Sequence, residues 1–111
     1  MRLNVGLLGG GSWGTTVAAL ISRNAPVMLW ARDAQTVHEI NTDRQNSRYL
    51  AGYTLPATMR ATADMGEAVR GADVLVMGVP SQNFRSVLMD VRQHIRPWVP
   101  VISLTKGFEL D

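Results

Sequence analysis

Residues 4–14 read NVGLLGGGSWG, and this stretch decides the predicted fold. An apolar run over residues 4–8 predicts a short buried strand, and three consecutive glycines follow it directly. Beyond the glycines, four apolar side chains fall at helical spacing on one predicted inward face: Trp13, Val17, Leu20 and Ile21. The stretch therefore indicates a strand, a glycine turn and a helix in immediate succession.

The glycines of this turn have the spacing Gly-x-Gly-x-x-Gly. Gly9 permits the tight turn from strand to helix, Gly11 leaves the backbone open to a pyrophosphate, and Gly14 lets the helix pack close to the strand. The free N–H groups and the partial positive charge at the start of the helix would face the phosphates. Between a strand and a helix, the motif predicts a dinucleotide site. A glycine-rich turn without a ligand is the alternative.

Ser12 and Trp13 fill the two variable positions of the turn. The Ser12 hydroxyl suits either a hydrogen bond to a phosphate oxygen or a cap on the helix. The Trp13 ring could cover the cofactor, although a large aromatic side chain at helical spacing is more often part of the core. We therefore expect the backbone N–H of Trp13 to be its contribution to binding.

Arg32 and Asp33 follow the second predicted strand, residues 26–30. Dinucleotide-binding proteins place the group that contacts the adenosine ribose at this point. The Arg32 guanidinium suits a 2′-phosphate, which predicts NADP(H) as the cofactor. Asp33 could instead bind the ribose hydroxyls, which would favour NAD(H), but aspartate is also a favoured N-cap residue. The cap is the simpler role, so we expect NADP(H) and leave NAD(H) open.

Strands alternate with helices along the rest of the chain. The further predicted strands cover residues 59–62, 74–79 and 101–104, and residues 44–57 are expected to form a loop. Residues 74–79 are apolar on both faces, as a central parallel strand should be. The alternation predicts an α/β fold, a Rossmann-type doubly wound parallel sheet with helices on both faces and about five of its usual six strands. We expect one domain over residues 1–111, incomplete at its C-terminal end, with residues 101–104 as an uncovered edge.

Three further helices connect these strands. Asp33 is expected to cap a helix that runs to about Asp43, and Asp64 with Glu67 has capping-box spacing for a short helix to about residue 70. Ser81 is expected to cap the last helix. The inward face of that helix is predicted to consist of Phe84, Val87, Leu88, Val91 and Ile95.

Composition is that of an ordinary globular domain, with 46% hydrophobic and 18% charged residues among 111. The absence of cysteine excludes disulfides, thiolate zinc sites and cysteine nucleophiles. His38 and His94 lie far apart in the sequence, so no metal site is expected. The net charge of +2 comes with scattered basic residues, which gives no sign of nucleic-acid binding. No apolar run is long enough to cross a membrane, and no signal peptide is predicted.

Five motifs, in this order, resemble those of bacterial NAD(P)-dependent glycerol-3-phosphate dehydrogenase. They are residues 9–15 (GGGSWGT), 29–33 (LWARD), 46–50 (NSRYL), 79–82 (VPSQ) and 105–107 (TKG). Together they span essentially the whole chain and are far more specific than the glycine turn alone. Gly10 departs from the family, whose members often have alanine there, a small-for-small change. The role of residues 46–50 has no physical explanation at the level of sequence.

The resemblance implies the interconversion of dihydroxyacetone phosphate and sn-glycerol 3-phosphate by hydride transfer, in a cytoplasmic enzyme of phospholipid synthesis. It implies that Ser12, Trp13 and Arg32 contact the cofactor and that Lys106 lies beside both nicotinamide and substrate. Pro80 begins a turn after the fourth strand, where ligands of parallel sheets bind, so this turn should line the nicotinamide side. Its other interpretation is simply a helix cap after a strand.

The family's proton-transferring lysine belongs to a C-terminal helical domain that this sequence lacks. We therefore expect these 111 residues alone to be catalytically inactive. A homodimer of the full-length enzyme stays open. Two other interpretations also stay open, because fold alone does not decide function. One is a related dehydrogenase of the 3-hydroxyacid or 6-phosphogluconate type, and the other is a stand-alone dinucleotide-binding module without catalysis.

Overall fold

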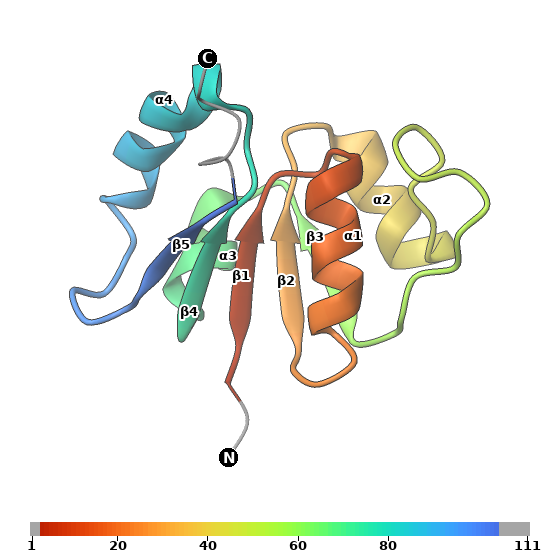
Figure 1. Ribbon diagram of the computed structural model, residues 1–111, viewed down its shortest axis with the longest axis horizontal. Coiled ribbons are helices and arrows are strands. Elements are labelled where there is room, and N and C mark those ends of the chain that lie inside the picture. Colours follow the sequence, from red (N-terminus) through yellow and green to blue (C-terminus); the bar gives the residue numbers. More distant parts are fainter. Residues whose placement is uncertain (1–2, 105–111) are drawn as a thin grey trace.

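A five-stranded parallel sheet forms the centre of the molecule in the computed structural model, which describes residues 3–104 and, for Ser81, the backbone alone (Figure 1). The strands are β1 (Val5–Leu8), β2 (Val27–Trp30), β3 (Met59–Thr62), β4 (Val74–Met77) and β5 (Val101–Ser103). The helices are α1 (Ser12–Ile21), α2 (Ala34–Asp43), α3 (Met65–Arg70) and α4 (Ser81–Val91). The predicted order of elements is confirmed, as is the absence of any helix or long strand in the loop over residues 44–57.

The strand order is β3-β2-β1-β4-β5, and every neighbouring pair is parallel. The chain builds outward from β1 to β3 on one side, then returns to place β4 and β5 on the other side of β1. The order therefore reverses beside β1, and the loops after β1 and β4 leave the sheet in neighbouring positions. Open α/β sheets bind ligands outside the carboxyl ends of the strands at such a point.

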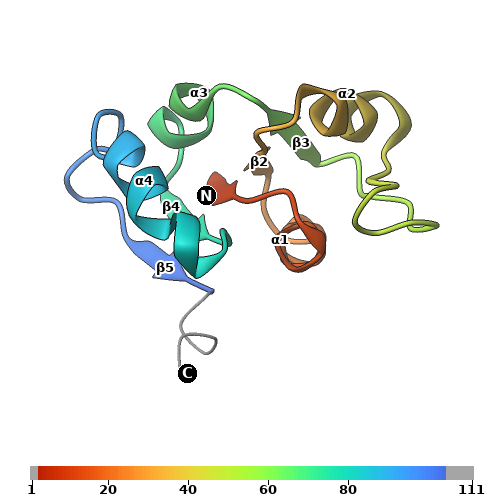
Figure 2. The same ribbon diagram turned by 90° about the horizontal axis from the view of Figure 1, so that it is seen from above.

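The core lies in two layers because side chains alternate between the faces of each strand. Leu7 faces the layer under α1 and α2, while its neighbour Leu8 faces the layer under α3 and α4. On β4 the same alternation places Val76 in the first layer and Leu75 in the second. The strand β4 is interior and buried, as predicted. Figure 2 shows α1 on the opposite side of the sheet from α3 and α4.

The predicted inward face of α1 is only half right. Val17 and Ile21 pack against the core, but Trp13 and Leu20 are 55% and 53% exposed, so the expectation that Trp13 belongs to the core is wrong. The face turned to the sheet carries small side chains instead: Gly14, Thr15, Ala18 and Ala19. The reason is the tight glycine turn, which brings α1 too close to the sheet for large side chains.

At α4, Val87 and Val91 are buried, and Phe84 and Leu88 pack against the same core cluster. The helix ends at Val91, so Ile95, predicted on its inward face, lies beyond it, although it packs against this cluster too. The predicted cap is wrong by one position, because the helix begins at Ser81 and Pro80 occupies the N-cap position. The strand β5 lies at the edge of the sheet, as expected, with Val101 and Ile102 exposed.

Candidate functional site

The glycine turn joins β1 to α1 with almost no space between neighbouring backbones. Gly9 has a φ angle of +129°, which only glycine adopts without strain, and a Cβ atom on it would lie 2.5 Å from the carbonyl oxygen of Gly78. A Cβ atom on Gly14 would lie 2.2 Å from the carbonyl oxygen of Gly9. By contrast, a Cβ atom on Gly11 would meet nothing within 4 Å. The geometric roles predicted for Gly9 and Gly14 are confirmed, and Gly11 borders open space.

A hollow of about 390 Å³ lies over this turn, at the carboxyl ends of β1 and β4; we call it the carboxyl-edge hollow. Its lining consists of the glycine turn, one residue of the loop after α2, and the turn after β4: Gly9, Gly10, Gly11, Ser12, Trp13, Gly14, Tyr49, Gly78, Val79 and Pro80. Pro80 thus lies beside the glycine turn, where the sequence placed it. The hollow stands at the point where the strand order reverses, which is where this class of sheet binds ligands.

The first turn of α1 has no side-chain cap, unlike those of α2 and α3. Gly11 is its N-cap residue, so the alternative in which Ser12 caps the helix is wrong. Asp33 caps α2 and Asp64 caps α3, each through a carboxylate oxygen. The start of α1 therefore borders the carboxyl-edge hollow, and no carboxylate within residues 3–104 caps it. A helix start with this geometry attracts anions, phosphate groups above all.

Asp33 is held by donors of its own helix. One carboxylate oxygen accepts a hydrogen bond from the Gln35 N–H at 3.1 Å, and the other accepts one from the Thr36 hydroxyl at 3.0 Å and lies 3.6 Å from the Arg48 guanidinium. These hydrogen bonds, the Gln35 bond foremost, lower the pKa of Asp33 below its usual value. The predicted cap is thus confirmed, while contact with a ribose stays a prediction.

Arg32 lies at the carboxyl end of β2, with its guanidinium carbon 5.3 Å from the centre of the Trp30 ring. It is exposed, and no acidic side chain pairs with it within residues 3–104. Its charge is therefore free to meet an anion, whereas Arg48 is already paired with Asp33. The predicted contact between Arg32 and a cofactor stays a prediction, and so do those of Ser12 and Trp13. Lys106 lies outside the described residues.

The sequence analysis did not predict two roles of residues 46–50 at the candidate site. Tyr49 lines the carboxyl-edge hollow, and Asn46 is a fully buried side chain bonded to the glycine turn. Both residues stand in the quoted NSRYL motif, which was the only signal, because the loop has no periodicity that assigns its side chains to a face.

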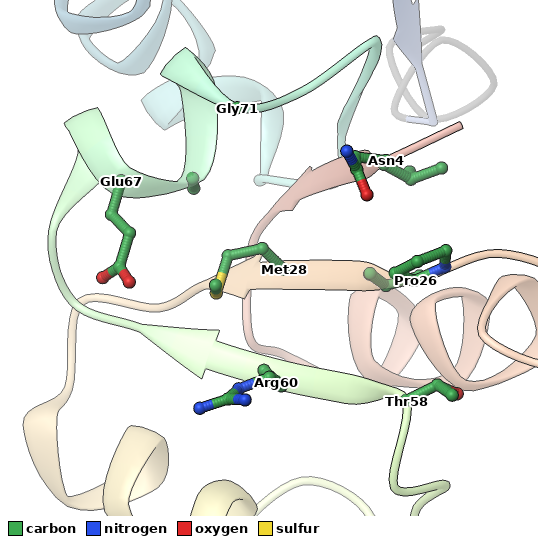
Figure 3. A pocket seen from close by; sticks show the side chains of 10 residues that line it. Asn4, Pro26, Met28, Thr58, Arg60, Glu67 and Gly71 are labelled. Atoms are coloured by element: carbon green, nitrogen blue, oxygen red, sulfur yellow. The ribbon is translucent and has the colours of Figure 1, made fainter. Parts of the chain in front are cut away.

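A second cavity, of about 260 Å³, lies at the other end of the sheet; we call it the amino-edge cavity. It is lined by the starts of β1, β2 and β3 and by α3: Asn4, Val5, Pro26, Val27, Met28, Thr58, Arg60, Glu67, Ala68 and Gly71. Figure 3 shows Glu67 extending from α3 toward the strands that carry Met28 and Arg60. Among residues 3–104, none of the candidate site residues lines it. No helix within residues 3–104 is long and apolar enough to cross a membrane.

A doubly wound parallel sheet with an uncapped glycine turn at its carboxyl edge defines a dinucleotide-binding domain of the Rossmann type. Comparison with known proteins identifies the family. The family described as NAD-dependent glycerol-3-phosphate dehydrogenase N-terminus matches residues 4–111, and the chain belongs to it.

Individual relatives agree with this assignment. The chain is 72% identical over 110 residues to a glycerol-3-phosphate dehydrogenase (NAD(P)+) of Sphingopyxis alaskensis, covering 99% of this chain and 33% of the relative. It is 54% identical over 104 residues to one of Mycobacterium bovis, covering 93% and 30%. The crystal structure of glycerol-3-phosphate dehydrogenase from Coxiella burnetii superposes with a TM-score of 0.86 at 30% identity, covering 96% of this chain and 34% of that one. The chain thus spans about a third of the length of the relatives it matches.

Proposed function

We propose that this chain forms the NADP(H)-binding part of a glycerol-3-phosphate dehydrogenase, which interconverts dihydroxyacetone phosphate and sn-glycerol 3-phosphate. The observation that carries the proposal is the uncapped start of α1, which opens on a hollow where Gly11 leaves space for a pyrophosphate. The names of the matched relatives, NAD(P)+-dependent glycerol-3-phosphate dehydrogenases, support the substrate. We place the enzyme in the cytoplasm, in phospholipid synthesis, and expect a homodimer.

In this proposal the residues of the carboxyl edge bind and orient the cofactor. The N–H groups at the start of α1 hold the pyrophosphate, with the Ser12 hydroxyl as a further donor. Trp13 adds its N–H, and its exposed ring is free to cover the dinucleotide. Arg32 pairs with the 2′-phosphate, because it is an exposed cation at the end of β2 without an acidic partner in the described part of the chain. Asp33 remains the cap of α2, and Pro80 borders the nicotinamide side.

The bound nicotinamide would supply the hydride for the carbonyl carbon of the substrate. The role we assign to Lys106 is electrostatic. Its ammonium attracts the substrate's oxygens and stabilises the negative charge that develops on the carbonyl oxygen during transfer. Proton transfer is left to a residue outside this chain.

The test is a titration of the full-length protein with NADPH and NADH, followed by an assay of dihydroxyacetone phosphate reduction through the loss of NADPH absorbance. We expect binding and turnover. Binding without turnover would favour a stand-alone dinucleotide-binding module, and the absence of binding would remove the proposal. Turnover of a 3-hydroxyacid but not of glycerol 3-phosphate would favour a related dehydrogenase.

Lys106→Met, which keeps the stem and removes the charge, tests the catalytic part. We expect kcat/KM to fall about 100-fold or more, the scale of a lost transition-state donor, while NADPH affinity falls much less. Near-normal kcat/KM would show that Lys106 is an ordinary surface lysine.

A further inference from the structure

Asn46 is a fully buried polar side chain in a loop without regular structure. Its Nδ2 donates to the carbonyl oxygen of Gly10 at 3.0 Å and to the Thr15 hydroxyl oxygen at 2.9 Å. Its Oδ1 accepts a hydrogen bond from the Tyr49 N–H at 3.4 Å. The Thr15 hydroxyl in turn donates to the same Gly10 carbonyl at 3.2 Å. The Gly10 carbonyl therefore receives two donors from two different parts of the chain.

Burial of an amide is unfavourable unless its polar atoms are bonded, and an apolar side chain would fill the same space without that requirement. The two hydrogen bonds that the Asn46 Nδ2 donates converge on a single backbone group, the Gly10 carbonyl, and on the hydroxyl that also binds it. That convergence indicates a role in orienting the peptide rather than in filling the core.

The peptide that Asn46 holds is the one between Gly10 and Gly11. A trans peptide is planar, so its C=O and N–H point in opposite directions. With the Gly10 carbonyl directed at the buried Asn46, the Gly11 N–H is turned away from Asn46. Gly11 itself lines the carboxyl-edge hollow, and a Cβ atom on it would meet nothing within 4 Å. Three consecutive glycines have the greatest backbone freedom of any sequence, and this peptide lies in the middle of them.

We propose that Asn46 is a positioning residue for the phosphate-binding turn. It fixes the Gly10–Gly11 peptide so that the Gly11 N–H is presented to the pyrophosphate of the dinucleotide before the cofactor binds. The inference rests on the proposed function and adds to it a residue that touches no ligand. It also gives the NSRYL motif a physical role, since Asn46 ties this loop to the turn while Tyr49 reaches the carboxyl-edge hollow.

The main experiment is Asn46→Asp in the full-length protein, with dissociation constants measured at a temperature where circular dichroism shows a folded chain. The change keeps the shape but replaces the donor facing the Gly10 carbonyl by an acceptor. We expect NADPH affinity to fall about tenfold or more, as for a lost and partly reversed hydrogen bond. Adenosine 2′-phosphate, which lacks the pyrophosphate, should bind within twofold of its affinity for the unmodified protein.

The matched control is Asn41→Asp. The side-chain amide of Asn41 also makes two hydrogen bonds to backbone groups. Its Nδ2 donates to the Ala61 carbonyl at 2.9 Å, and its Oδ1 accepts from the Ala61 N–H at 2.8 Å. It ties α2 to β3 and does not touch the glycine turn. We expect this variant to lower the melting temperature and to leave NADPH affinity within twofold.

A second pair of variants keeps the inference testable if Asn46→Asp does not fold. Thr15→Val removes the hydroxyl that accepts a hydrogen bond from Asn46 and donates one to the Gly10 carbonyl. Thr15→Ser retains this hydroxyl while removing a methyl group. Loss of NADPH affinity of about threefold to fivefold in the valine variant, with near-normal affinity in the serine variant, identifies the hydrogen bond as the cause. The opposite order would assign the effect to packing.

Three outcomes would overturn the inference. They are NADPH affinity within twofold in folded Asn46→Asp, an equal loss for adenosine 2′-phosphate, and an equal loss in Asn41→Asp. If the unmodified protein binds NADPH while one of these holds, the inference fails and the proposed function stands. If the unmodified protein binds no dinucleotide at all, both fail.

Discussion

Two hollows of the molecule, one at each end of the sheet, differ in what lines them. The amino-edge cavity, of about 260 Å³, is formed mainly by side chains from three strands and α3. Five of the ten residues that line the carboxyl-edge hollow, of about 390 Å³, are glycines. A well-formed apolar pocket is the usual first hypothesis for a ligand site. Here the candidate site lies in the carboxyl-edge hollow instead, so the chemistry of the lining residues identifies the ligand site better than the apolar character of a pocket.

The charged and polar groups at the two ends of the sheet also favour the carboxyl edge as the ligand site. At the carboxyl edge, the start of α1 has no side-chain cap and Arg32 has no acidic partner within the described residues. At the amino edge, the Glu67 carboxylate already accepts a hydrogen bond from the Thr62 hydroxyl at 2.6 Å. The carboxyl edge thus has an uncapped helix start, as an anion site requires, and the following changes test that difference.

The largest effect should come from Gly14→Ala, compared with Gly71→Ala at the amino edge. A methyl group on Gly14 would collide with the backbone carbonyl of Gly9, which cannot move without distorting the turn, whereas one on Gly71 would meet nothing within 4 Å. We expect the first change to lower the free energy of unfolding by about 3 kcal/mol or more and the second by less than about 0.5 kcal/mol. Urea denaturation measures both, and equal values would remove the packing argument for the turn.

Gly11→Ala should separate binding from stability. Gly11 has an ordinary extended backbone and open space around it, so alanine fits without strain. The added methyl group would stand where the pyrophosphate must approach, and we expect NADPH affinity to fall about tenfold or more while the melting temperature stays unchanged. Gly71→Ala is again the control. Unaltered NADPH affinity in Gly11→Ala would place the phosphates elsewhere.

Arg32→Ala and Arg60→Ala compare a cation at each edge. A charged contact to the 2′-phosphate is worth roughly 1.5–3 kcal/mol, so removal of the Arg32 side chain should weaken NADP(H) about tenfold or more and leave NAD(H) nearly unchanged. Removal of the Arg60 side chain should change neither affinity. Titration of both cofactors against both variants decides the matter. Equal losses of NADP(H) and NAD(H) in Arg32→Ala would reopen the case for Asp33.

Asp33→Ala should have the smallest effect, on stability alone. Because the pKa of Asp33 is lowered in the folded state, its carboxylate stabilises the fold above the unfolded pKa of about 3.9, and this contribution is lost as the pH falls through the lower, folded pKa. The variant should therefore melt earlier at pH 7, with a difference that shrinks below about pH 4. Asp90→Ala, at an exposed carboxylate of α4, is the control. Loss of NAD(H) affinity in Asp33→Ala would instead indicate ribose binding.

Much of this fold could be predicted because its signals are local. The apolar run of β4, the glycine turn and the Asp33 cap each lie within a few consecutive residues, and all three are confirmed. The face of α1 was misjudged because periodicity does not register how near the glycine turn brings the helix to the sheet. Asn46 and Tyr49 were missed because their roles depend on residues distant in the chain; the hydrogen bonds of Asn46 to Gly10 and Thr15 span 36 and 31 residues.

The close approach of the backbones of Gly9, Gly14 and Gly78 limits which sequences can form this glycine turn. A Cβ atom on Gly9 would lie 2.5 Å from the Gly78 carbonyl oxygen, and one on Gly14 would lie 2.2 Å from the Gly9 carbonyl oxygen. In an ordinary core, an enlarged residue can be accommodated by a smaller neighbour. Here the atoms nearest to a Cβ atom on Gly9 or Gly14 are backbone atoms of another glycine, so no smaller side chain there can make room. Redesign of cofactor preference is therefore better directed to the end of β2, where Arg32 is exposed and its replacement disturbs no backbone contact.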